Sequence, residues 1–324
     1  MATPTGVQTD FVIYDEEFNS SMAERLNVNI NLWNGATKGG LVLTTKHTMG
    51  HFSKVSMYKR LSQAVVEEFD PRTKGTTTWT SLEGFENASV KVWRDMALSG
   101  TLDEFKVMLE EPNATFSQLV GALTADLITK DAVETLVGAL IGAIENEPTH
   151  VLGDFTKEIT FSDINSAQFV YGDSYKDVAC ILVHSNCAKG LVELNLSEKL
   201  DSVAGYSIRT GEWASLGIPV IISDIDSLKS GANNNVLFLK SGGAMCMHSE
   251  AVTAVSQIDV DARPMEMKLK REWAFNIGLA GMSYDTSKTA YPTRANLADK
   301  TFWKITASDT KDLPVVLFKS KASA

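Results

Sequence analysis

One segment, residues 172–224, constrains the fold of this chain more than any other. An apolar run at 178–183 leads into His184 and Ser185, and a second apolar run begins at Ile218. Short runs that are apolar throughout and bounded by turn residues are typical of strands buried on both faces. A serine directly before a helical stretch is a good N-cap. The segment therefore predicts a buried strand at 177–184, a helix at 186–194 and a second buried strand at 218–224, within one α/β lobe.

The first fifty residues predict an extended N-terminal arm. They are mostly polar, and asparagines alternate with Val28, Ile30 and Leu32 over 27–34. Alternation with period two is typical of a half-buried strand. A segment with so few apolar residues has little core of its own. We therefore expect residues 1–50 to need a sheet or a neighbouring chain to lie on.

Residues 51–95 predict a projecting β-arm. The runs at 65–69 and 88–93 have strand character, and a polar, threonine-rich tip joins them. A two-stranded arm is at best marginally stable alone. Its stability would have to come from a partner subunit.

Residues 101–147 predict helix. Thr101-x-x-Glu104 fits the capping-box pattern, and Asp131-x-x-Glu134 is a close variant of it. Two apolar sets follow helical spacing, but they are out of phase between Leu127 and Val133. This predicts a long helix over 114–146 with a break or kink near 129–131.

A second motif lies near the C-terminus. A long strand at 265–275 precedes a Pro-Thr-x-x-x-Leu-Ala stretch at 292–298, then Trp303 and an apolar run at 313–318. Together with the segment at 172–224, this order resembles tailed-phage major capsid proteins with the HK97-like shell fold. The resemblance in plan covers roughly residues 40–319. It implies an α+β fold with an N-terminal arm, an extended β-arm (the E-loop), a long spine helix and a mixed α/β axial domain.

The resemblance also implies a domain plan and a function. The N-terminal arm would be 1–50, the E-loop 51–95 and the axial domain 151–255, while 96–150 and 256–324 would form the peripheral domain. The closing strand would pack either with the peripheral domain or with the axial domain. The function would be a coat protein that self-assembles into hexamers and pentamers of an icosahedral head around double-stranded DNA, with maturation of a procapsid by rigid-body rearrangement. Expected partners are copies of the chain, a scaffolding protein, a portal and a decoration protein. The location would be the virion, and the host cytoplasm during assembly.

The charge of the chain agrees with such a role. The formal net charge is −10, whereas a protein that binds duplex DNA directly usually presents a basic face. We expect no sequence-specific DNA contact and no cofactor. The longest apolar run, at 136–144, is too short to cross a membrane.

Two possible metal sites are alternatives to a purely structural role for these residues. The residues Cys180, His184, Cys187, Cys246 and His248 supply possible metal ligands, but the tight knuckle spacing of zinc sites is missing. Pairs of aspartates at 224 and 226 and at 259 and 261 could hold a cation, although aspartates in turns are commoner.

Other functions also remain open. His184 with Cys187 could form the nucleophile pair of a cytosolic hydrolase, although no oxyanion motif accompanies it. Within the shell fold, an encapsulin-like compartment is the nearest alternative. We expect no enzymatic activity.

The contact residues expected between subunits fall in three places. Lys74, Trp79 and Phe85 lie on the projecting arm, where an exposed tryptophan is a typical interface anchor. Lys268 and Arg271 belong to a basic cluster on the long strand. Pro292 and Arg294 lie in the loop at 281–296, which the resemblance places at three-fold axes.

Overall fold

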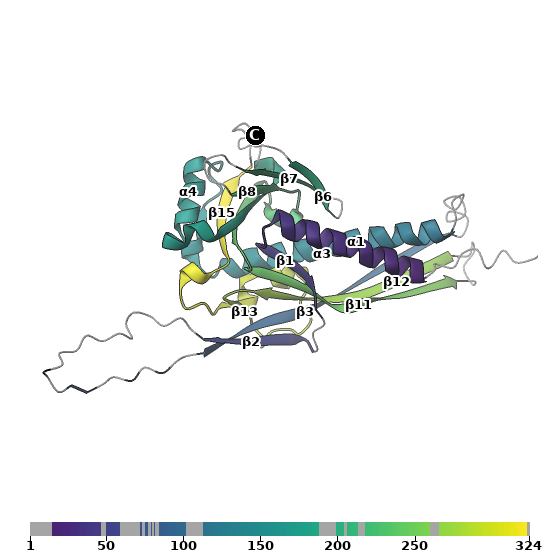
Figure 1. Ribbon diagram of the computed structural model, residues 1–324, viewed down its shortest axis with the longest axis horizontal. Coiled ribbons are helices and arrows are strands. Elements are labelled where there is room, and N and C mark those ends of the chain that lie inside the picture. Colours follow the sequence, from purple (N-terminus) through teal and green to yellow (C-terminus); the bar gives the residue numbers. More distant parts are fainter. Residues whose placement is uncertain are drawn as a thin grey trace, which may run out of the picture.

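The computed structural model describes residues 15–46, 50–58, 72, 75–76, 79, 81, 84–101, 113–187, 199–203, 206–212, 218–259 and 266–322. Two β-sheets, with long helices between them, form the body of the subunit (Figure 1). The larger hydrophobic core joins side chains of both sheets around residues 125–144, the C-terminal part of the longest helix. No described helix is both long and apolar enough to cross a membrane.

The first sheet has seven strands in the order β1-β11-β12-β13-β14, and β12 also pairs with β3, which pairs with β2. Its long central strands, β11 and β12, run antiparallel to each other. The strand bounds are β1 Leu41–Thr45, β2 Phe52–Tyr58, β3 Gly84–Thr101, β11 Ala244–Asp259, β12 Glu266–Leu279, β13 Met282–Tyr284 and β14 Trp303–Ile305.

The second sheet has eight strands in the order β4-β15-β10-β5-β8-β7-β6, with β9 on β10. The two predicted buried strands are neighbours here: β5 and β8 pair in parallel, with Ile181 opposite Val220. Residues 185–187 are helical, and the rest of the predicted helix lies outside the described residues. The bounds are β4 Val151–Gly153, β5 Val178–Val183, β6 Lys199–Val203, β7 Tyr206–Glu212, β8 Pro219–Ile222, β9 Lys229–Ser230, β10 Asn233–Lys240 and β15 Val315–Lys321.

Apart from the two long helices, which are described below, the helices are short. They are α4 Phe161–Phe169, α6 Arg294–Ala298 and the 3-10 turns η3 Pro148–His150, η4 Gly172–Asp177, η5 Asp226–Leu228, η6 Lys300–Phe302 and η7 Thr310–Asp312. Thr160 caps α4 through a capping box with Asp163.

Sheet membership changes along the chain at two points. The consecutive strands of the second sheet, β4 to β10, end at Lys240. The next strand, β11, begins at Ala244 and belongs to the first sheet, although the predicted axial domain extends to residue 255. The closing strand β15 then returns to the second sheet between β4 and β10.

The N-terminal segment differs from the prediction. Residues Asp15–Ala36 form a helix, α1, rather than an extended arm with a strand at 27–34. The buried positions Phe18, Met22, Asn29 and Trp33 follow the 3.6-residue period of a helix, whereas Val28, one of the predicted strand residues, is exposed. The alternating asparagines suggested a strand, but the spacing of the large apolar side chains decides the structure.

The helix α3, Asn113–Ile144, is the long helix that the sequence predicts. It continues as α-helix through 129–131, where a break was expected. The phase difference between the two apolar sets of this helix therefore has another cause. Leu119, Leu123 and Leu127 of the first apolar set are exposed, and the buried face there consists of small residues such as Gly121 and Ala125.

α1 lies alongside α3 and is held there by polar contacts (Figure 1). Arg25 Nε donates to Asp126 Oδ1 at 2.9 Å, and Asn29 Nδ2 donates to the same oxygen at 2.7 Å. The two backbones approach closely, because a Cβ on Gly121 would lie 2.6 Å from the carbonyl oxygen of Phe18. Glycine is what permits this approach.

Candidate assembly interface

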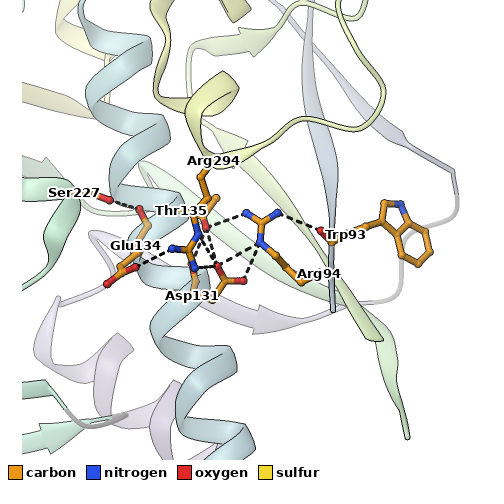
Figure 2. Close-up of polar contacts among 7 residues, drawn as sticks. All are labelled: Trp93, Arg94, Asp131, Glu134, Thr135, Ser227 and Arg294. Carbon is orange, nitrogen blue, oxygen red and sulfur yellow. Dashed lines mark hydrogen bonds and ion pairs between the residues drawn. The ribbon is translucent and has the colours of Figure 1, made fainter. Parts of the chain in front are cut away.

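A charged cluster joins the first sheet, α3 and the loop before α6 (Figure 2). It consists of Arg94 on β3, Asp131 and Glu134 on α3, and Arg294 at the start of α6. Asp131 is the common acceptor. Arg94 Nε lies 3.2 Å from its Oδ2, and Arg294 Nε donates to its Oδ1 at 3.0 Å. Arg294 Nη2 also contacts Oδ1, and Arg294 Nη1 lies 3.3 Å from Glu134 Oε2.

The surroundings of the cluster fix its geometry. The Asp131 side chain is only 8% exposed, whereas that of Arg294 is 54% exposed. Thr135 Oγ1 donates to Asp131 Oδ1 at 3.3 Å, and Ser227 Oγ donates to the Glu134 carbonyl at 2.8 Å. Charge-assisted hydrogen bonds of this kind are about twice as strong as neutral ones. The cluster therefore ties three elements that are far apart in the sequence.

The short helix α6 positions Arg294. Thr293 accepts a hydrogen bond from the Asn296 backbone at 3.2 Å, and Asn296 Oδ1 accepts one from the Thr293 backbone at 3.1 Å. This reciprocal cap starts the helix at Arg294. A Cβ on Gly142 of α3 would lie 2.5 Å from the Ala298 carbonyl carbon, so α6 rests directly on the helix backbone.

A half-buried histidine, His248, and a buried thiol, Cys246, lie near the same aspartate. Burial lowers the pKa of His248 to about 4, and the charge of Asp131 opposes that shift. Burial also raises the pKa of the Cys246 thiol. Both groups are therefore neutral at physiological pH and belong to the core between β11 and α3.

The structure places the predicted contact residues unevenly. Trp79 is 90% exposed. Lys74 lies outside the described residues, as does the predicted strand at 65–69, and of Phe85 only the strand position in β3 is described. Lys268 is exposed and lies 3.9 Å from Glu266 of its own strand.

Two of the predicted contact residues are buried within the subunit. Arg271 is fully buried, with its guanidinium carbon 3.6 Å from the centre of the Phe18 ring, so it is not a surface cation. Arg271 was expected as a contact between subunits, but its side chain lies on the face of β12 that packs against Phe18, whereas Lys268 and Lys270 of the same strand are exposed. Pro292 is also buried, directly before the cap of α6.

Sequence reasoning missed three members of the charged cluster. Asp131 and Glu134 were interpreted as a capping box, but they lie in the middle of α3. Arg94 was not singled out. The spacing of three residues placed the two carboxylates on one face of a helix, and this was the one local signal for a shared partner.

The predicted hydrolase pair is not arranged for catalysis. His184 Nδ1 accepts a hydrogen bond from the Asn186 backbone at 3.1 Å, and Cys187 Sγ lies 3.8 Å from the Lys321 carbonyl. Burial raises the pKa of the Cys187 thiol, which disfavours the nucleophilic thiolate. Burial similarly raises the pKa of Cys180 to about 12. Among the described residues, no group of three or more His, Cys, Asp or Glu side chains is placed to hold a metal ion.

A long helix between two sheets, one of them extended by a hairpin of β2 and β3, defines the class of HK97-like capsid proteins. Residues 10–317 match the Gp13-like family, described as major capsid protein 13-like, and the chain belongs to this family. It is therefore a major capsid protein of a phage head, a structural component of the virion and not an enzyme. The family match favours the phage head over an encapsulin-like compartment.

Solved structures share the fold at low sequence identity. The chain is similar to one titled Microbacterium phage Oxtober96, with 13% identity, a TM-score of 0.55 and coverage of 87% of this chain and 90% of that one. It is also similar to one titled Mycobacterium phage Bobi, with 11% identity, a TM-score of 0.54 and coverage of 87% and 89%. A third, titled Mycobacterium phage Adephagia, has 9% identity, a TM-score of 0.53 and the same coverage. A search of curated proteins found no match.

Proposed function

We propose that this subunit assembles into hexamers and pentamers in which the β2–β3 hairpin acts as an E-loop and reaches over an adjacent subunit. One observation carries the proposal. β2 pairs with β3 and with no other described strand, and it exposes Val55. On the segment that joins the two strands, Trp79 is 90% exposed. A two-stranded ribbon with an unburied tryptophan gains its stability by docking elsewhere.

The remaining parts of the shell plan follow from the same family resemblance. The second sheet with α4 is the axial domain, whose loops meet at capsomer centres. The first sheet with α3 is the peripheral domain, and the loop at 281–296 forms the contact at three-fold axes. The charged cluster braces this arrangement, because it holds that loop and β3, the inner strand of the hairpin, to the same helix.

Further partners complete the proposal. A separate scaffolding protein directs assembly, a portal occupies one vertex, and a decoration protein binds the outer surface. The DNA inside is enclosed without sequence-specific contacts. The net charge of −10 supports this, because a tight DNA binder needs many cationic contacts with phosphates.

Replacement of the exposed tryptophan tests the proposal. Trp79→Ala should reduce the yield of shells at least tenfold, because interface anchors of this type contribute 2 kcal/mol or more at each of many equivalent contacts, by the order-of-magnitude range for hot spots. The measurement is negative-stain electron microscopy of the protein co-expressed with its candidate scaffolding protein. The unassembled subunit should keep its wild-type far-UV circular dichroism.

A matched control is Phe169→Ala. Phe169 is also an exposed aromatic residue, but it lies on α4, where it stacks on Tyr175 at 5.2 Å between ring centroids. This variant should assemble normally. Shells of Trp79→Ala with wild-type yield and wild-type thermal stability would refute the role of the hairpin.

A further inference from the structure

The first half of α3 presents an apolar surface that no described part of the subunit covers. Leu119, Leu123 and Leu127 are 57%, 54% and 52% exposed. They are spaced four residues apart, so they form one ridge along the helix. We call these three residues the leucine ridge.

The second half of the same helix shows what covers such a ridge. Glu134 lies seven residues after Leu127, which is about two helical turns, and Gly138 lies four residues after Glu134, so both continue the stripe of Leu123 and Leu127. Glu134 is covered by Arg294, and Gly138 lies under Ser227. The C-terminal half of the stripe is thus packed against other parts of the subunit, whereas the three leucines of its N-terminal half are more than half exposed among the described residues.

The leucine ridge also lacks charge. Residues 113–125 contain no Asp, Glu, Lys or Arg. The next residue, Asp126, is neutralised by Arg25 at 2.9 Å. The adjacent helix α1 continues the pattern, because residues 27–36 are uncharged and Val28 and Leu32 are exposed. Depletion of charge is the compositional mark of an interface core.

We propose that the leucine ridge is an isologous contact, in which α3 of one subunit packs antiparallel against α3 of a second copy about a two-fold axis. The low charge of this face suits contact between copies of the chain. Two subunits of net charge −10 repel each other over most of their surfaces, whereas the leucine ridge is itself uncharged and the exposed Lys130 beside it is a cation, so two copies meet there at little electrostatic cost. The antiparallel arrangement also opposes the two helix dipoles favourably.

The two-fold arrangement makes a specific prediction about neighbours. In an isologous contact, a residue near the axis meets its own equivalent. Leu123, in the middle of the ridge, should meet Leu123 of the copy, and Leu119 should meet Leu127. The inference rests on the proposed self-assembly, and its test is made on assembled shells.

Disulfide crosslinking tests the contact, because the three native cysteines are all buried. In shells of Leu123→Cys, mild oxidation should convert most of the protein to a disulfide-linked dimer on a non-reducing gel. Asn165→Cys, an exposed position on the helix α4 of the other sheet, should stay monomeric. If Leu123→Cys does not assemble, a mixture of Leu119→Cys and Leu127→Cys chains should crosslink, whereas each alone should not.

Two results would overturn the inference while leaving shell formation intact. Leu123→Cys shells whose thiol reacts freely with maleimide would show that the ridge is uncovered. A protected thiol without any dimer would show that a different segment or a scaffolding helix covers it. Failure of the wild-type chain to form shells would instead refute the proposed function.

Discussion

Asp131→Asn is expected to destabilise the unassembled subunit by about 3 kcal/mol, because removal of one partner from a buried ion pair typically costs roughly 3–5 kcal/mol. The variant keeps the size of the side chain and removes its charge. Arg94 and Arg294 would both lose their shared anion. Urea unfolding of the full chain, monitored by tryptophan fluorescence, measures the free energy of unfolding.

The matched control lies on the same helix. Asp126 also pairs with an arginine, but its side chain is 21% exposed and that of Arg25 is 40% exposed. Solvent screens such a pair, so Asp126→Asn should cost only about 1 kcal/mol. Equal losses for the two variants would mean that the charged cluster is not a special brace.

Gly142→Ala should destabilise the subunit by about 2 kcal/mol and loosen α6. The new methyl group would lie 2.5 Å from the carbonyl carbon and oxygen of Ala298, and this backbone has no rotamer through which to yield. Overpacking typically costs roughly 1–3 kcal/mol, and the higher helix propensity of alanine offsets about 1 kcal/mol of it. Displacement of α6 should also weaken the hold of Arg294 on Asp131.

The chain offers a close control four residues earlier. A Cβ on Gly138 would meet nothing nearer than Ser227 Oγ at 3.5 Å, which is an ordinary contact. Gly138→Ala should therefore be neutral or stabilise the subunit by up to about 1 kcal/mol. Thermal unfolding of both variants compares them directly. If Gly142→Ala melts at or above the temperature of Gly138→Ala, the close approach of α6 is not real.

The strongest features of the fold could be predicted because they are local. The strands β5 and β8 follow from two apolar runs with turn residues around them, and the helix α3 follows from apolar spacing. The resemblance in plan implied the α+β HK97-like fold, and the family match confirms that fold. In each case a few neighbouring residues carry the information.

The features of the fold that could not be predicted depend on contacts between residues that are distant in the sequence. Phe18 and Trp33 of α1 are buried only because α3 and β12 lie beneath them, whereas the asparagines between them suggested a strand. The exposed leucines of α3 looked like core residues, because periodicity alone does not say which face is covered.

The charged cluster shows the same limit at the site itself. Arg94 and Arg294 lie 37 and 163 residues from Asp131 along the chain. The sequence offered only the spacing of Asp131 and Glu134, which equally fits a helix cap. Arg271 was predicted as a contact between subunits because nothing in its neighbourhood reveals that its side chain packs against Phe18 of α1. These errors arise from tertiary contacts rather than from local propensity.

The central claim is that the subunit is completed only by copies of itself. A cryo-electron microscopy reconstruction of assembled particles tests it most directly, by tracing the hairpin of β2 and β3 from Phe52 through Trp79 to Thr101. We predict closed shells in which Trp79 is buried against an adjacent subunit. A compact particle of one chain, with Trp79 packed on its own body and no shells under any assembly condition, would contradict it.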